Sequence, residues 1–263
     1  MTASSTSSLV LLEFDDHGDR GRVARVTFNN PEKRNALGLA GKDRLVEIMT
    51  SLRHDESLRA VVITGSGDRS FVGGTDLAEM AEFDLAAAEA SATKTHRVCD
   101  SVRQMPVPVI ARINGYCFGS GMEIAACADM RVAADHARFG MPEVRHGIPS
   151  GMEASVLPRL IGWGKACELV LTGDHIDAQE AYRIGYLERL VPMAELDAAV
   201  DRWLESILAA GPRAVRIQKR LILDWDRMSV TDAARAGIQA FVDAYRTDEP
   251  RRLMTAFVNR RRG

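Results

Sequence analysis

The feature that most constrains the fold of this chain is an alternation of short apolar runs with stretches of helical spacing. Residues 60–64 form a continuous apolar run that ends in glycines, a pattern typical of a strand buried on both faces. Similar runs occur at residues 107–113 and 130–134, and helical patterns lie between the runs at 78–103 and 122–127. Strands that alternate with helices predict an α/β architecture.

The two ends of the chain depart from this alternation. Residues 1–8 are small and polar, so we expect a disordered tail there. An α/β core is predicted at residues 9–200, and it opens with two strand patterns and one helical pattern, at residues 9–14, 22–28 and 39–52. Strand signals nearly vanish after residue 154, and residues 201–263 are predicted to form a helical C-terminal region.

Charge and composition exclude several classes of function. The formal net charge is −2, which provides no field for holding a nucleic-acid backbone or an anionic membrane. No run approaches the ~18 apolar residues of a membrane span. The four cysteines form no CxxC pair, which favours a reduced, cytoplasmic protein. The six histidines form no HExxH or comparable set, so no metal site is expected.

Two familiar motifs are approached but not completed. Residues 65–70 follow a strand and resemble the start of a dinucleotide fingerprint, but Ser70 stands where the third glycine belongs. Ser120 lies between two glycines, but Phe118 and Met122 occupy the glycine positions of a G-x-S-x-G nucleophile motif. A turn and an ordinary serine are the better interpretations.

Two glycine-containing turns carry more information. Residues 71–77 and 114–121 each place flexible backbone before a helix, where amide groups lack internal acceptors and the helix dipole is positive. Asp76 and Glu79 form a D-x-x-E pattern that would cap a helix starting near Leu77. Each turn alone is ordinary, but two of them facing one point would bind a partly negative oxygen.

Glu123 makes the second turn more distinctive. It follows Ser120 by three residues, so both lie on the same face of the first helical turn. Its apolar neighbours predict burial, and a buried carboxylate is usually paired or shifted in pKa. Stabilisation of the helix terminus and acid–base catalysis are the two explanations.

Five segments together resemble the enoyl-CoA hydratase/isomerase (crotonase) superfamily. They are PEKRNAL, FVGGTDLAEM, PVIARINGYCFGSGMEIAACADMRVA, ARFGMPEVRHGIP and MTAFVNRR. The resemblance runs from about residue 22 to the C-terminus. It implies a ClpP/crotonase fold, a spiral of ββα units with a helical C-terminal oligomerisation region. It also implies a homotrimer or homohexamer.

The resemblance further implies an enoyl-CoA hydratase that acts on an acyl-CoA thioester and needs no cofactor, since coenzyme A belongs to the substrate. The backbone amides of Thr75 and Ser120 would form the oxyanion hole. Glu123 would be the base and Glu143 the acid, although two carboxyls that share a water titrate as a pair and the roles are exchangeable. The coenzyme A-binding positions would be Arg34, Ala36, Gly73, Asp76, Leu77, Phe257 and Arg260.

Departures from the family pattern leave alternatives open. Relatives usually carry glycine at the Ser120 position and often alanine at Thr75, so these side chains are expected to narrow the pocket. Ser150 and Glu153 form an S-x-x-E pattern, for which we favour a helix cap over catalysis. Glu153 also argues against simple straight-chain substrates. The functional alternatives are an isomerase, a thioester hydrolase, and a non-enzymatic acyl-CoA-binding or RNA-binding relative.

Overall fold

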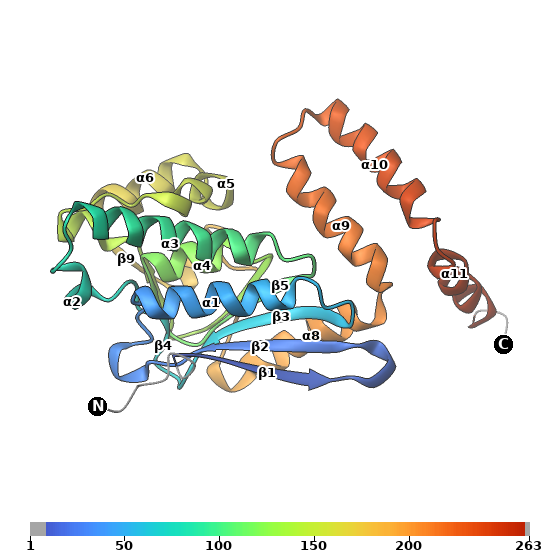
Figure 1. Cartoon of the computed structure of the whole chain (residues 1–263), viewed down its shortest axis with the longest axis horizontal. Helices are drawn as coiled ribbons and strands as arrows, with labels where there is room; N and C mark the ends of the chain where they lie inside the picture. The colour runs from blue at the N-terminus through green and yellow to red at the C-terminus, as the bar shows by residue number, and fades with distance from the viewer. Residues whose placement is uncertain (1–8, 261–263) are drawn as a thin grey trace.

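The computed structural model describes residues 9–260 (Figure 1). Its larger sheet has six strands in the order β1-β2-β3-β5-β7-β10, all parallel to their neighbours except the antiparallel β1–β2 pair. The strands are β1 (Val10–Asp16), β2 (Arg22–Phe28), β3 (Leu58–Gly65), β5 (Val109–Ile113), β7 (Met130–Ala134) and β10 (Arg189–Val191). The predicted α/β class is confirmed.

Helices cover both faces of this sheet. Successive side chains of β3 point to opposite faces, so each face of the strand contributes to a different core. Val61 and Ile63 join the core that includes buried residues of α1 (Leu39–Leu52) and α3 (Leu85–Arg103). Ala60 and Val62 join a second core beneath α8 (Leu196–Ala209). A strand buried on both faces explains the continuous apolar run seen in the sequence.

A second, smaller sheet was not predicted. It has the order β4-β6-β8-β9, with the first three strands parallel and β9 antiparallel to β8. Its strands are β4 (Ser70–Val72), β6 (Tyr116–Phe118), β8 (Arg138–Gly140) and β9 (His175–Asp177). β4 and β6 fall within or beside the stretches interpreted as turns, because a three-residue strand is too short to show a period.

The helix expected over residues 78–103 is instead two helices. α2 (Leu77–Met80) is capped by Asp76, whose Oδ1 accepts the Ala78 amide at 3.1 Å, as predicted. α3 then begins after Asp84, whose Oδ1 accepts the Ala87 amide at 2.8 Å. Aspartate is more favourable at an N-cap than in the interior of a helix, so Asp84 starts a new helix within the stretch expected to be continuous.

The remaining helices agree with the expected helical stretches up to the C-terminal region. They are α4 (Ser120–Cys127), α5 (Leu157–Ile161), α6 (Trp163–Thr172) and α7 (Ala178–Arg183). Short 3-10 helices lie at Gly18–Arg20, Pro31–Lys33, Pro142–His146, Met152–Val156 and Met193–Glu195. Strands β9 and β10 correct the expectation that strands end near residue 154.

The C-terminal helices α9 (Pro212–Trp225), α10 (Val230–Ala244) and α11 (Glu249–Arg260) extend away from the body (Figure 1). The boundary expected at residue 200 falls inside α8, which packs on the sheet, so the projecting part begins with α9. The tail expected at residues 1–8 lies outside the described residues. None of the helices in residues 9–260 is long and apolar enough to cross a membrane.

Candidate active site

Three parallel strands of the smaller sheet deliver the expected site residues to one edge. β4 is followed by the turn that contains Thr75, β6 by the turn that contains Ser120, and β8 by Glu143. Parallel strands end at the same edge of a sheet, so segments far apart in sequence meet there. The Gly119 amide ties two of these ends together, since it donates to the Gly140 carbonyl at 3.0 Å.

A cavity of about 350 Å³ lies at this edge. Thr75, Ser120, Glu123 and Glu143 all line it, so the four residues expected to do the chemistry share one space. Its other walls come mainly from α2, α3 and the segment after Glu143. They include Leu77, Met80, Phe83, Ala88, Ser91, Ala92, Thr95, Phe118, His146, Ile148, Pro149 and Met152.

The Thr75 and Ser120 amides are available to a ligand. In the turn after β4, the Gly73 amide donates to the Arg34 carbonyl at 2.9 Å, and the Gly74 carbonyl accepts the Leu37 amide at 3.0 Å. Within residues 9–260, neither the Thr75 amide nor the Ser120 amide donates to a protein acceptor. Ser120 is also the first residue of α4, where an amide has no acceptor in its own helix.

The side chains of Thr75 and Ser120 contact each other. Thr75 Oγ1 donates to Ser120 Oγ at 3.3 Å, so the two turns are in contact through their side chains. Both hydroxyls belong to cavity-lining residues. The extra atoms relative to alanine and glycine therefore join the two amide-bearing turns.

Glu123 lies deep beside the cavity, on the first turn of α4, with 2% of its surface exposed. Its Oε1 accepts the Ala154 amide at 2.9 Å. The pKa of this carboxyl is raised to about 8, chiefly by burial. The Ala154 amide acts in the opposite direction, and the nearby charges of Glu143 and Glu153 contribute to the increase. A group with such a pKa holds its proton at neutral pH and can give it up during a reaction.

Glu143 is held in the 3-10 helix at Pro142–His146. Its Oε2 accepts the Ser150 hydroxyl at 2.8 Å. Its Oε1 lies against Gly119, where an added Cβ would come within 2.5 Å of that oxygen. Gly119 also has a φ of 52°, a conformation that other residues rarely adopt. The glycine therefore makes room for the carboxyl that the strand edge presents.

The cap predicted from Ser150 and Glu153 is wrong. The 3-10 helix at Met152–Val156 follows Gly151 and has no side-chain cap, because the Ser150 hydroxyl is bonded to Glu143. Glu153 is buried, with Oε1 2.7 Å from His96 Nδ1. Within the described chain its Oε2 has no hydrogen-bond partner. Glu153 does not line the cavity, so it acts on Glu123 only through its charge.

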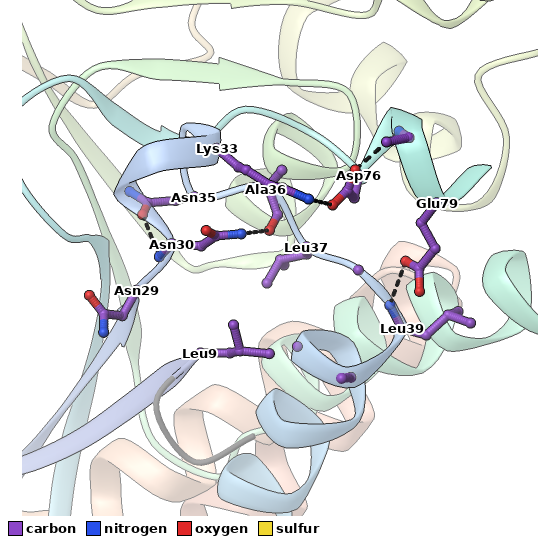
Figure 2. A pocket seen from close by; sticks show the side chains of 14 residues that line it. Leu9, Asn29, Asn30, Lys33, Asn35, Ala36, Leu37, Leu39, Asp76 and Glu79 are labelled. Atoms are coloured by element: carbon purple, nitrogen blue, oxygen red, sulfur yellow. Dashed lines mark hydrogen bonds and ion pairs between the residues drawn. The ribbon is translucent and has the colours of Figure 1, made fainter. Parts of the chain in front are cut away.

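The positions expected to bind coenzyme A divide into two groups. Gly73 and Leu77 line the cavity that holds the glutamates, and Ala36 and Asp76 line a neighbouring cavity of about 330 Å³ (Figure 2). Arg34 lines neither cavity, and its guanidinium lies 5.2 Å from the centre of the Tyr116 ring.

Two contacts seen in Figure 2 hold these loops together. Lys33 Nζ lies 2.7 Å from Asp76 Oδ2, and Glu79 Oε2 accepts the Leu39 amide at 3.0 Å. The second contact means that Glu79 serves the start of α1 rather than α2. Lys33, Ser150 and the Ala154 amide were not predicted, because the sequence pattern does not indicate their side-chain partners.

Phe257 and Arg260 are not brought to either cavity. Both belong to α11, which lies at the opposite end of the molecule from α2 (Figure 1). Phe257 is 53% exposed. Within residues 9–260, no group of three or more His, Cys, Asp or Glu side chains is arranged to hold a metal ion.

Known proteins resemble this chain in both sequence and fold. Residues 18–263 match the enoyl-CoA hydratase/isomerase family. Crotonyl-CoA hydratase of Syntrophomonas wolfei is 37% identical over 245 residues, which cover 92% of this chain and 93% of that protein. The structure of enoyl-CoA hydratase from Bacillus anthracis superimposes with a TM-score of 0.90 at 32% identity, over 95% of this chain and 96% of the other.

A third relative was solved with a ligand. It is a Thermobifida fusca protein described as an enoyl-CoA hydratase in complex with CoA, with a TM-score of 0.82 at 31% identity over 91% of this chain and 93% of that one. These likenesses confirm the crotonase fold expected from the motifs. They cover nearly the whole chain, including the strands that build the cavity. The chain therefore belongs to the enoyl-CoA hydratase/isomerase family.

Proposed function

We propose that this chain is an enoyl-CoA hydratase, which adds water across the α,β double bond of an enoyl-CoA thioester. One observation carries the proposal: two amides without protein acceptors and two glutamates line a single cavity. The name of the Syntrophomonas relative, a crotonyl-CoA hydratase, supports the same reaction. Oxyanion stabilisation and acid–base catalysis are the two contributions that hydration needs.

The amides of Thr75 and Ser120 would hold the thioester oxygen. When the oxygen of water bonds to the β-carbon, the electrons of the double bond move onto that carbonyl oxygen and form an enolate. Two aimed amides stabilise the developing charge, and the loss of one such donor typically costs ~3 kcal/mol.

Glu123 and Glu143 would act as an acid–base pair. One carboxyl takes a proton from the attacking water, and the other gives a proton to the α-carbon as the enolate collapses, so the atoms of water are accounted for. The raised pKa of Glu123 means that this carboxyl keeps its proton at neutral pH. Because the two groups share a water, the roles belong to the pair and exchange between hydration and its reverse.

The coenzyme A part would lie along Arg34, Ala36, Gly73, Asp76 and Leu77, where an arginine suits a phosphate. We propose that Phe257 and Arg260 reach the nucleotide from a neighbouring copy of the chain, in a homotrimer or homohexamer. The exposed apolar side chains of the projecting helices support such assembly. They are Ile222, Trp225, Ile238, Phe241, Val242, Tyr245, Met254, Phe257 and Val258.

The proposed location is the cytoplasm. The four cysteines, Cys99, Cys117, Cys127 and Cys167, are free thiols, as in a reducing compartment. The near-zero net charge supports the absence of nucleic-acid and membrane partners.

Glutamate replacement tests the proposal. We expect Glu123→Gln and Glu143→Gln each to cut turnover of crotonyl-CoA by at least ~100-fold, while coenzyme A affinity stays nearly unchanged. Glu47→Gln, which changes an exposed glutamate on α1, is the matched control. Turnover is measured from the loss of the conjugated enoyl absorbance.

A measurement of free thiol beside the enoyl absorbance separates the alternatives. A thioester hydrolase would release free thiol, and an isomerase would move the double bond without adding water. Near-normal hydration by either glutamine variant would remove that glutamate from the mechanism.

A further inference from the structure

Lys42 is a buried lysine that the proposed mechanism does not use. It lies on α1 with 1% of its surface exposed, on the same helix face as the buried Leu45 and Met49. Within residues 9–260 it forms no ion pair, and its Nζ donates to one neutral partner, Ser91 Oγ, at 3.1 Å. Burying an ammonium group without a contacting carboxylate costs folding free energy, so we expect a functional role for Lys42.

The charged groups near Lys42 do not neutralise it by contact. Its pKa is lowered to about 8, chiefly by burial. Glu79 and Glu123 act in the opposite direction, and Lys94 acts in the same direction as burial. The Glu79 carboxylate accepts the Leu39 amide (Figure 2), and the Glu123 carboxyl accepts the Ala154 amide. With a pKa above neutrality, most Lys42 side chains still carry their charge at neutral pH.

Ser91 connects this charge to the cavity. It lies on α3 with Ala88, Ala92 and Thr95, at helical spacing, and all four line the cavity that holds the glutamates. The Ser91 oxygen accepts from Lys42, so its own proton is left to donate. The Thr95 hydroxyl donates its proton to the Ser91 carbonyl at 3.0 Å, so it has no proton left to donate to a ligand.

The wall around Ser91 is otherwise mainly apolar. The apolar cavity residues from α2, α3 and the segment between them are Leu77, Met80, Phe83, Ala88 and Ala92. A purely hydrocarbon acyl chain would fit these side chains but would leave the Ser91 proton unpaired and the Lys42 charge uncompensated. A site that offers a buried donor selects a ligand that fills it with an acceptor.

We infer that the cavity takes enoyl-CoA thioesters whose acyl chain ends in a carboxylate, which Ser91 binds by its hydroxyl and Lys42 neutralises through Ser91. This inference rests on the proposed hydratase function and names its substrate class. Lys42 and Ser91 are specificity-determining residues in this scheme, and neither transfers a proton. A charge-assisted hydrogen bond of this kind is stronger than a neutral one.

Matched pairs of substrates test the inference. Each pair has the same number of carbons and ends either in a methyl group or in a carboxylate, and several chain lengths are compared by kcat/KM. At the best length we expect the wild type to prefer the carboxylate by at least ~10-fold. Lys42→Met and Ser91→Ala should each remove that preference while changing kcat/KM for the methyl substrate by less than ~3-fold.

Controls keep the outcomes distinct. Lys94→Met removes a lysine on α3 that pairs with Asp43 near the surface, and it should leave the preference unchanged. If Lys42→Met fails to fold, Ser91→Ala alone decides. Hydration of methyl substrates without any carboxylate preference, or a preference that survives Ser91→Ala, would overturn the inference but leave the hydratase intact. If the protein hydrates neither the methyl substrates nor the carboxylate substrates, both the carboxylate inference and the hydratase proposal are overturned.

Discussion

Glu123 couples the chemistry of the site to the stability of the protein. Its carboxyl is 2% exposed, and burial raises its pKa to about 8 from an ordinary value of 4.5. The perturbation that isolates this effect is Glu123→Gln, which keeps the shape and an acceptor for the Ala154 amide but carries no titrating proton. We therefore expect the two proteins to differ in how stability depends on pH.

The sign follows from proton counts. Between pH 4.5 and about 8 the folded state keeps the Glu123 proton that the unfolded chain has lost, so the free energy of unfolding falls as the pH rises. The stabilisation is fully present below pH 4.5 and is lost as the pH passes through about 8. At ~1.4 kcal/mol for each pH unit, the whole window corresponds to about 5 kcal/mol.

The assay is urea unfolding at fixed protein concentration, followed by circular dichroism at several pH values. Between about pH 6 and about pH 7.5, Glu123→Gln should gain ~2 kcal/mol of stability relative to the wild type. Glu47→Gln, an exposed change, should show no such trend. A stability difference between wild type and Glu123→Gln that stays constant across this range would refute the claim that Glu123 is protonated when folded.

Three further changes test the site. Gly119→Ala places a Cβ within 2.5 Å of Glu143 Oε1 at a φ of 52°, so we expect ~1–2 kcal/mol less stability in urea unfolding and at least ~10-fold lower kcat. Ser120→Ala keeps the amide, so kcat for crotonyl-CoA should stay within ~3-fold of wild type; a ~100-fold loss would mean that the hydroxyl does the work. Glu153→Gln removes a charge that raises the pKa of Glu123, so the corresponding ionisation in the kcat/KM pH profile should move to lower pH.

Five of the six strands of the larger sheet, all except β10, could be predicted because burial governs their sequence pattern. β3 is buried on both faces and shows as an uninterrupted apolar run, and α1 shows its buried face as helical spacing from Leu39 to Leu52. Both patterns are local, so they survive without knowledge of the partners. The same holds for Glu123, whose apolar neighbours correctly indicated burial.

The partners of polar side chains could not be predicted in the same way. Ser150 reaches Glu143, which precedes it by seven residues, instead of Glu153, which the capping pattern suggested. The helical spacing of α1 predicts that position 42 is buried, but lysine is rarely buried, so the residue type alone predicts exposure. Its hydrogen-bond partner Ser91 belongs to another helix and cannot be identified from the spacing. Side-chain partners decide both cases, and sequence spacing does not reveal them.

The glycines of the second turn show how the active site is encoded nonetheless. A Cβ on Gly121 would lie 2.3 Å from the Val72 carbonyl oxygen, and one on Gly115 would lie 2.2 Å from the Arg69 carbonyl oxygen. Neither has a positive φ, so their purpose is close approach and not an unusual backbone conformation. Their lack of side chains lets β6 and the start of α4 pack directly on β4. That packing brings the turns of Thr75 and Ser120 together at one cavity. The same glycines that interrupt the strand pattern in the sequence therefore shape the proposed oxyanion hole.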